Sequence, residues 1–155
     1  MEGALQVRLL ARRLPEWFNA QGLEEIARDL RAHEGWVAVR GRRVVGWAMW
    51  APEGERGASL SWIGVEKGEH WHGIGTALLA ALEGRLRALG KESLFVSTVA
   101  PSVDYEPYAR ARAFYRASGF ADFRVDRGHF KDPRGDYDRL LLRKAIGGPG
   151  AKGPR

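Results

Sequence analysis

The chain alternates between short apolar runs and segments whose apolar residues recur at helical spacing. An apolar run at 5–10 predicts a first strand. After Pro15, leucine and isoleucine return every three or four residues, which predicts a helix that ends near Gly35. Three apolar runs then follow with short turns between them, and these predict consecutive antiparallel strands. The three strands are predicted at 36–40, at 44–51 and from residue 58 onward.

The pattern changes at residue 73, where a leucine stripe at helical spacing predicts a long amphipathic helix that closes at Gly90. A buried strand is predicted at 93–99, and a second helix begins near Pro107 and ends near Gly119. Two further strands are predicted at 121–127 and 137–145. The order of strands and helices implies one α/β domain, which we place at 1–146, with a mixed sheet and helices packed on it.

Composition narrows the function classes. The 155 residues are 45% hydrophobic and 28% charged, as in ordinary globular proteins, and they include no cysteine. Thiolate catalysis and cysteine-ligated metal sites are therefore excluded. The net charge of +6 comes from 25 basic and 19 acidic residues, but four of the basic ones lie in the last 13 positions. Removing these four leaves +2, so most of the excess charge belongs to the basic, Gly/Pro-rich end of the chain from Arg143 onward. Residues 147–155 are predicted to be disordered.

One loop carries most of the functional information: the sequence WIGVEKGEHWHGIGTALL, from Trp62 to Leu79. A predicted strand leads into a glycine-bearing loop and then into a helix, so unpaired N–H groups at the helix start would favour an anion. Gly73 and Gly75 lack side chains that would hinder a phosphate. The third glycine of a dinucleotide-binding fingerprint and the GK[ST] of a P-loop are absent. His70 and His72 are also compatible with a metal site, although solvated loop histidines are commoner.

This loop resembles motif A of the GNAT acetyltransferase superfamily, with His70 where arginine or glutamine is usual. ARAFYRASGF, at 111–120, is similar to a second segment of that family, and the resemblance spans about residues 5–145. A tyrosine at position 108 and the GDYD turn at 135–138 resemble a branch whose substrate is not settled. The resemblance implies a mixed, mostly antiparallel sheet of about six to seven strands with helices on both faces.

The resemblance further implies acetyl-CoA as co-substrate, no metal, and acetyl transfer to an amine. The pyrophosphate would lie on the loop, the pantetheine arm along the strand edge at 63–65, and Thr98 on the opposite wall. Tyr108 replaces an asparagine that often touches the cofactor. The predicted cofactor-binding residues are Ile63, Val65, His70, Trp71, His72, Gly73, Ile74, Gly75, Thr76, Thr98 and Tyr108.

Tyr115 is the predicted proton donor to the CoA thiolate, because the family has a tyrosine in this place and a phenol is a suitable acid there. Many relatives have a glutamate general base where this chain has Ser59. Glu66 is the predicted substitute, with Asp104 and Glu106 as alternatives, and a water chain is a further option. Without a cysteine nucleophile, transfer is expected to be direct.

The acceptor pocket is predicted at Trp17, Phe18 and Phe130, and the acceptor is a small-molecule or peptide amine of unknown identity. Two other readings stay open: a non-catalytic acyl-CoA-binding or regulatory module, and a small basic nucleic-acid-binding domain. No specific nucleic acid or membrane is expected as a partner, since the longest apolar run falls short of a membrane span. A cytoplasmic location is expected, and the resemblance is compatible with a homodimer.

Overall fold

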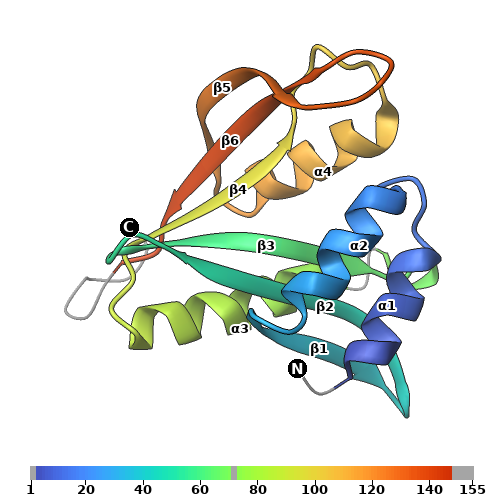
Figure 1. The fold of residues 1–155 in the computed structure, drawn as a ribbon. Coiled ribbons are helices and arrows are strands. Elements are labelled where there is room, and N and C mark those ends of the chain that lie inside the picture. The colour runs from blue at the N-terminus through green and yellow to red at the C-terminus, as the bar shows by residue number, and fades with distance from the viewer. Residues whose placement is uncertain (1–2, 71–72, 148–155) are drawn as a thin grey trace.

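The computed structural model describes residues 3–70 and 73–147, so Trp71, His72 and most of the predicted tail lie outside the described residues. The chain forms a mixed α/β fold (Figure 1). The elements, in chain order, are α1 (Ala4–Arg12), α2 (Ala20–Asp29), β1 (Glu34–Arg40), β2 (Arg43–Glu53), β3 (Gly57–Val65), the 3₁₀ turn η1 (Lys67–Glu69), α3 (Ile74–Ala88), β4 (Ser93–Val99), α4 (Glu106–Ala117), β5 (Ala121–Phe130) and β6 (Tyr137–Ala145).

Two local predictions near the N-terminus are wrong. The expected strand at 5–10 is the helix α1, which buries Val7, Leu10 and Ala11. Their spacing is that of one helical face, and the run of apolar letters concealed it. The helix predicted to end near Gly35 is α2, and it ends at Asp29. Gly35 instead belongs to β1. The remaining predicted strands and helices are confirmed, with small differences at their ends.

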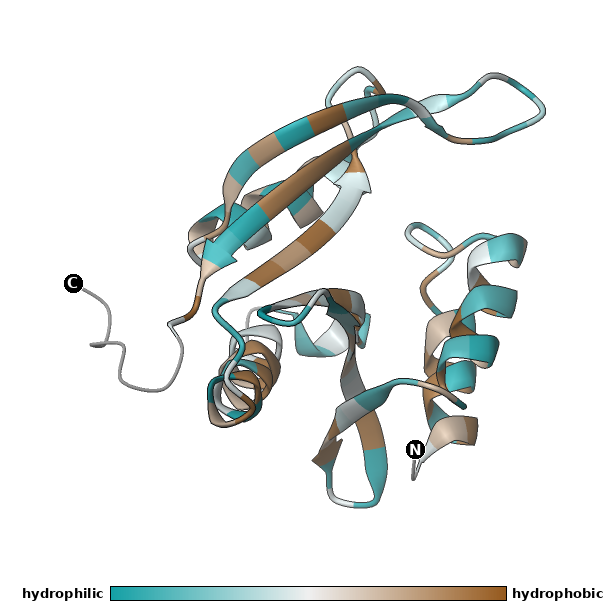
Figure 2. Ribbon diagram, turned by 60° about the vertical axis from the view of Figure 1, so that its left-hand side comes forward, coloured by the Kyte–Doolittle hydropathy of each residue, from teal (hydrophilic) through white to brown (hydrophobic). Residues whose placement is uncertain are grey.

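The six strands form one sheet in the order β1-β2-β3-β4-β6-β5, and every neighbouring pair except β3 and β4 is antiparallel. The parallel pair is joined only over Gly57–Leu60 and Ser93–Val96. β3 continues to Val65 and β4 to Val99, and from that point the two halves of the sheet spread apart (Figures 1 and 2). We call the end of the pairing, at Leu60 and Val96, the fork.

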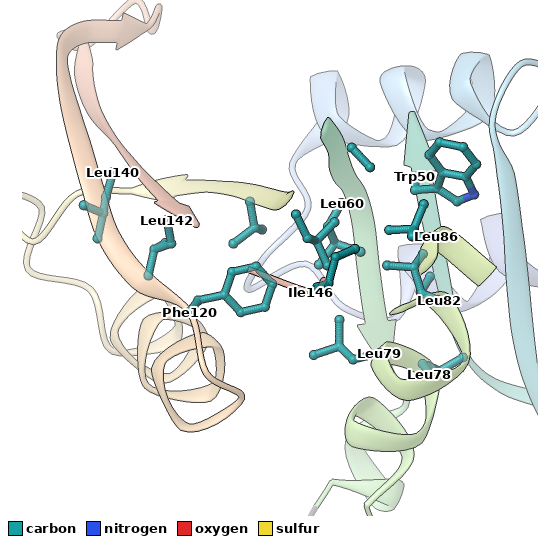
Figure 3. Close-up of a cluster of buried hydrophobic side chains, with 14 of the residues drawn as sticks. Trp50, Leu60, Leu78, Leu79, Leu82, Leu86, Phe120, Leu140, Leu142 and Ile146 are labelled. Atoms are coloured by element: carbon teal, nitrogen blue, oxygen red, sulfur yellow. The ribbon is translucent and has the colours of Figure 1, made fainter. Parts of the chain in front are cut away.

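Helices cover both faces of the sheet, as the family resemblance implied. One apolar cluster packs α3 against the strands and reaches Phe120, Leu140 and Leu142 beside α4 (Figure 3). A second cluster packs α1 and α2 against the opposite face, around the fully buried Trp47. Figure 2 shows these two layers, with the apolar side of α3 turned toward the sheet. The fork therefore lies between two layers of helices.

Two glycines permit the close packing beside the fork. A Cβ atom on Gly64 in β3 would lie 2.2 Å from the Trp47 ring, and one on Gly46 in β2 would lie 3.0 Å from Ile74 of α3. Both distances are shorter than van der Waals contact, so a larger residue would displace a ring or a helix. The glycines thus fix how closely Trp47 and α3 approach the strands.

Among the described residues, no helix combines the length and apolar character needed to cross a membrane.

Candidate acetyl-CoA site

The open edge of β3 can be located from one peptide bond. The N–H of Glu66 donates to the carbonyl of Val45 in β2 at 2.8 Å. A trans peptide directs its C=O opposite to its N–H, so the Val65 carbonyl points away from β2 and toward the fork. The His70 ring meets that carbonyl, with Nε2 2.9 Å from the oxygen. Ile63 and Val65 therefore border the opening between β3 and β4, as the sequence predicted, and His70 lies at its end.

The loop between β3 and α3 is held by ion pairs from the N-terminal segment. Glu66 accepts hydrogen bonds from Arg13 and Arg43, at 2.7 and 3.0 Å. Lys67 donates to Glu16 at 2.7 Å, and Arg40 donates to both carboxylate oxygens of Glu69. These contacts fix the backbone just before the glycine-bearing part of the loop.

The two loop glycines act for different reasons. Gly73 adopts a left-handed conformation, with φ +75°, and a Cβ atom there would meet nothing within 4 Å. Its backbone angle therefore requires glycine and its surroundings are open. Gly75 lies in the first turn of α3, and a Cβ there would lie 3.0 Å from Cζ of Phe114 in α4. Gly75 thus brings α3 close to α4, a packing role that the sequence argument did not include.

The start of α3 presents free donors. Gly73, the N-cap residue, makes no side-chain cap hydrogen bond, and the first helical bond runs from the N–H of Ala77 to the Gly73 carbonyl. The N–H groups of Ile74, Gly75 and Thr76 therefore have no acceptor within the helix. Thr76 is exposed, so its hydroxyl is available at the same place. Donors of this kind, with the helix dipole behind them, favour a bound phosphate.

Thr98 lies on β4 beyond the fork, on the wall opposite Ile63 and Val65. Tyr115 lies on α4, where its ring packs against Phe114 and Phe120 with centroids 5.6 and 5.9 Å away. Burial raises the pKa of the Tyr115 phenol to about 12. The hydroxyl thus stays protonated through the neutral range, as a proton donor must.

Tyr108 stands at the other end of the same helix, against Tyr105 at 4.6 Å between ring centroids. Burial is the main cause that raises the pKa of its phenol, and the neighbouring Tyr105, Tyr137 and Asp132 add to the shift. Its surroundings are the loop between β5 and β6 and the start of α4.

The contacts of Glu66 oppose its predicted role as a base. Two guanidinium groups hold its carboxylate, and the hydrogen bond from Arg13 is the main cause that lowers its pKa. A carboxylate that loses its proton so readily is a weak proton acceptor. Of the alternatives, Glu106 is largely exposed, 3.8 Å from Arg110. Ser59, where relatives often have a glutamate, donates to Glu53 at 3.0 Å.

The residues predicted for the acceptor pocket are not gathered in one place. Trp17 lies between His70, with ring centroids 5.8 Å apart, and Pro107 at the start of α4. Phe18 packs on Trp47 and Trp62 in the core beneath α1 and α2. Phe130 ends β5, where its ring meets His129. Among the ring contacts of the described residues, none joins Phe130 to either of the other two.

The sequence argument missed three polar residues near the fork: Asp29, His33 and Ser61. Ser61 Oγ lies 2.8 Å from His33 Nδ1, and the other ring nitrogen of His33 lies 3.9 Å from Asp29. Asp29 and His33 are separated by four residues at the end of a predicted helix, which was the only signal in the sequence. It is a weak signal, because the serine partner comes from a strand 28 residues further along.

Comparison with solved structures confirms the fold. The fold matches a GNAT-family protein from Desulfovibrio desulfuricans with a TM-score of 0.78 and 24% identity, over 93% of this chain and 92% of that one. It also matches the Escherichia coli ribosomal-protein-S18-alanine N-acetyltransferase, with TM-score 0.72, 19% identity and coverage of 96% and 92%. An aminoglycoside 6'-N-acetyltransferase complexed with coenzyme A gives TM-score 0.72, 19% identity and coverage of 98% and 93%.

The family model of the GNAT acetyltransferases matches residues 6–120, and the chain therefore belongs to the GNAT acetyltransferase family. A comparison with curated proteins found no match. The predicted family and fold are thus confirmed, and the protein is an acetyltransferase by family. The match covers the fork, the loop before α3 and the whole of α4.

Proposed function

We propose that this protein transfers the acetyl group of acetyl-CoA directly to a primary amine. The observation that carries the proposal is the fork, where β3 and β4 part beyond Leu60 and Val96 beside the free donors of α3. An open strand edge offers alternating N–H and C=O groups to the amides of a pantetheine arm. A pyrophosphate is favoured at the adjacent helix start. A pantetheine arm and a diphosphate are both parts of coenzyme A.

Each predicted cofactor residue has a part in this proposal. The edge at Ile63 and Val65 would bind the pantetheine amides, with Thr98 on the facing wall. The loop from His70 to Gly75 would hold the diphosphate, and Thr76 would add its hydroxyl. Trp71 and His72 belong to the same loop and stay in the prediction, although they lie outside the described residues. His70 already contacts the Val65 carbonyl, so binding of the arm would compete with this contact or leave that oxygen to the histidine.

Tyr115 would donate its proton, or a hydrogen bond, to the sulfur as the C–S bond breaks. The phenol is protonated at neutral pH, and its place on α4 is fixed by the aromatic packing around it. Because burial raises its pKa to about 12 and so weakens it as an acid, a hydrogen bond to the sulfur is favoured over full proton transfer in the unliganded site. Tyr108, toward the start of α4, would border the opening of the same site. We do not carry Glu66 into the mechanism, because its ion pairs occupy it.

The acceptor is proposed to be a small-molecule or peptide amine. Two structural neighbours are named for such acceptors, an aminoglycoside and the alanine of a ribosomal protein. Trp17 is the predicted pocket residue best placed for this role, because it lies beside both His70 and the start of α4. A cytoplasmic location and a homodimer stay predictions.

The test combines binding with turnover. Calorimetry with acetyl-CoA measures affinity, and release of free thiol measures transfer to a panel of amines: kanamycin, spermidine, tryptamine and a hexapeptide with N-terminal alanine. We expect acetyl-CoA binding and thiol release that depends on one panel amine. Tyr115→Phe should lower kcat by about 10²-fold at unchanged acetyl-CoA affinity. Tyr105→Phe, at the N-cap of α4, is the matched control. Absence of acetyl-CoA binding to the folded protein would contradict the proposal.

A further inference from the structure

Ser61 lies at the fork and is left out of the strand pairing on both sides. The pairing of β2 with β3 passes from Met49–Trp62 to Trp50–Leu60, so Ser61 is the extra residue of a β-bulge. It is also the first residue of β3 beyond the last pair with β4, Leu60–Val96. A bulge redirects a side chain that would otherwise follow the alternation of the strand. Ser61 therefore lies at the point where the two halves of the sheet part, and its hydroxyl is directed to His33.

The hydroxyl of Ser61 contacts the imidazole of His33, which lies 28 positions earlier in the chain. Ser61 Oγ lies 2.8 Å from Nδ1 of His33, in the turn between α2 and β1, and both side chains are partly buried. The opposite nitrogen, Nε2, lies 3.9 Å from Oδ1 of Asp29. The neutral imidazole that carries its proton on Nε2 suits both neighbours, since it accepts from the serine and turns its N–H toward the carboxylate.

The carboxylate of Asp29 is itself fixed. Its Oδ2 accepts a hydrogen bond of 2.8 Å from Nε1 of Trp62, the residue that follows Ser61. Its Oδ1 lies 3.5 Å from Nε of Arg28, and its backbone carbonyl accepts from the N–H of His33 at 2.8 Å. Asp29 and His33 are mostly buried, with 16% and 22% of their side chains exposed. A negative charge is thus held behind the imidazole, where it would stabilise a positive charge on the ring.

We propose that Ser61 and His33 form the proton relay that deprotonates the acceptor amine, an inference that rests on the proposed function. As the amine nitrogen bonds to the acetyl carbon, an N–H proton passes to Ser61 Oγ, and the serine proton passes to Nδ1 of His33. The C–S bond breaks, and the departing sulfur takes the proton of Tyr115. Ser61 then carries the former amine proton, and His33 carries the former serine proton as an imidazolium beside Asp29. After product release, solvent takes the proton from His33 and returns one to Tyr115.

Other groups at the fork are occupied. The Glu66 carboxylate is bonded to Arg13 and Arg43, and the Ser59 hydroxyl is bonded to Glu53. The Ser61–His33 pair joins the Ser61 hydroxyl to a ring nitrogen that can accept its proton. His33 acts through Ser61 and is a positioning and proton-accepting residue, whereas Ser61 is the residue that touches the amine.

The experiment compares Ser61→Ala, His33→Asn and the control Ser59→Ala, using the panel amine with the highest turnover. Asparagine can accept the serine hydrogen bond but cannot take its proton, so it separates the chemical role of His33 from a structural one. We expect kcat to fall about 10²-fold in Ser61→Ala and His33→Asn, with unchanged acetyl-CoA affinity and a cooperative thermal transition that shows each variant to be folded. Ser59→Ala should keep wild-type kcat.

The pH profile gives a readout that a structural role would not move. The dependence of kcat on pH should differ between the wild type and His33→Asn, because only the wild type has a side chain at position 33 that can take up the proton. Asp29→Asn should lower kcat at unchanged acetyl-CoA affinity, because it removes the negative charge that would stabilise the protonated ring. Added imidazole should restore part of the activity of His33→Ala.

Three results would overturn the relay: wild-type kcat in folded His33→Asn, an unchanged pH profile in that variant, or acetylated Ser61 in a peptide digest after turnover. The last would show a covalent intermediate in place of proton transfer. A wild-type protein that binds no acetyl-CoA, or that acetylates none of the panel amines, contradicts the proposed function itself and removes the relay with it. If instead the wild type acetylates a panel amine and the variants have the same kcat, the proposed function stands and only the relay is contradicted.

Discussion

The indole Nε1 of Trp17 donates a hydrogen bond of 3.0 Å to the backbone carbonyl of Pro107. These residues are 90 positions apart, and the bond ties the segment between α1 and α2 to the start of α4. The same ring meets His70 on one side and the guanidinium of Arg110 on the other. Trp17 therefore joins the two halves of the molecule beside the opening of the fork.

Trp17→Phe should lower the free energy of unfolding by about 0.5–1.5 kcal/mol, the net value of one hydrogen bond. The phenyl ring keeps most of the packing, so the loss reports mainly the missing donor. Urea denaturation measures it, with Trp36→Phe as the control. Trp36 packs on the core from β1, so Trp36→Phe measures the stability lost when a tryptophan's buried apolar area is reduced. If Trp17 also borders the acceptor, the KM for the amine should rise in Trp17→Phe while acetyl-CoA affinity is unchanged.

Gly64→Ala should destabilise the protein by about 1–3 kcal/mol, because the added methyl group would lie 2.2 Å from the Trp47 ring in a closely packed core. Gly84→Ala is the opposite case. Gly84 lies in α3, with open space around a Cβ, so alanine should stabilise the helix by up to about 1 kcal/mol. Thermal unfolding of both variants provides the comparison. Equal melting temperatures would show that Trp47 moves aside at little cost.

The alkaline stability of the protein should depend on Tyr115. Its folded pKa of about 12 lies above the ordinary value of 10.0, so the unfolded chain releases this proton first. The stability that Tyr115 contributes is complete below pH 10 and is lost as the pH rises from about 10 to 12. The wild type should therefore lose about 2 kcal/mol more than Tyr115→Phe over that interval. Urea titrations at several pH values measure the difference, and parallel curves for the two proteins would argue against a buried phenol.

Glu66 gives the reverse dependence. Its pKa lies below the ordinary value of 4.5, with the hydrogen bond from Arg13 as the main cause, so its stabilising effect is present above that value and is lost as the pH falls. Glu66→Gln should be less stable than the wild type by about 1 kcal/mol at pH 7, and the difference should vanish in acid. Turnover decides its chemical role. A loss of kcat near 10²-fold in Glu66→Gln would restore it as the general base.

Much of the fold follows from local pattern. The leucine stripe of α3 and the apolar runs of β2, β4 and β6 pack against neighbours within the core, so their spacing records their secondary structure. The strand predicted at 5–10 is wrong because the apolar positions of this segment fit a short strand as well as a helix. Only the burial of Val7, Leu10 and Ala11 on one side of α1 distinguishes the two. The helix end predicted at Gly35 is wrong because a glycine can stand at a helix cap or near the start of a strand, and here it lies in β1.

The sequence alone identified the family, because the loop before α3 and the segment around Tyr115 each match a motif whose residues lie close together in the chain. Tertiary structure alone decided which polar groups are available. It paired Glu66 with Arg13 across 53 positions and Ser61 with His33 across 28, and it moved Phe18 into the core. Such pairings depend on how strands and helices stack in space, and no local spacing encodes them.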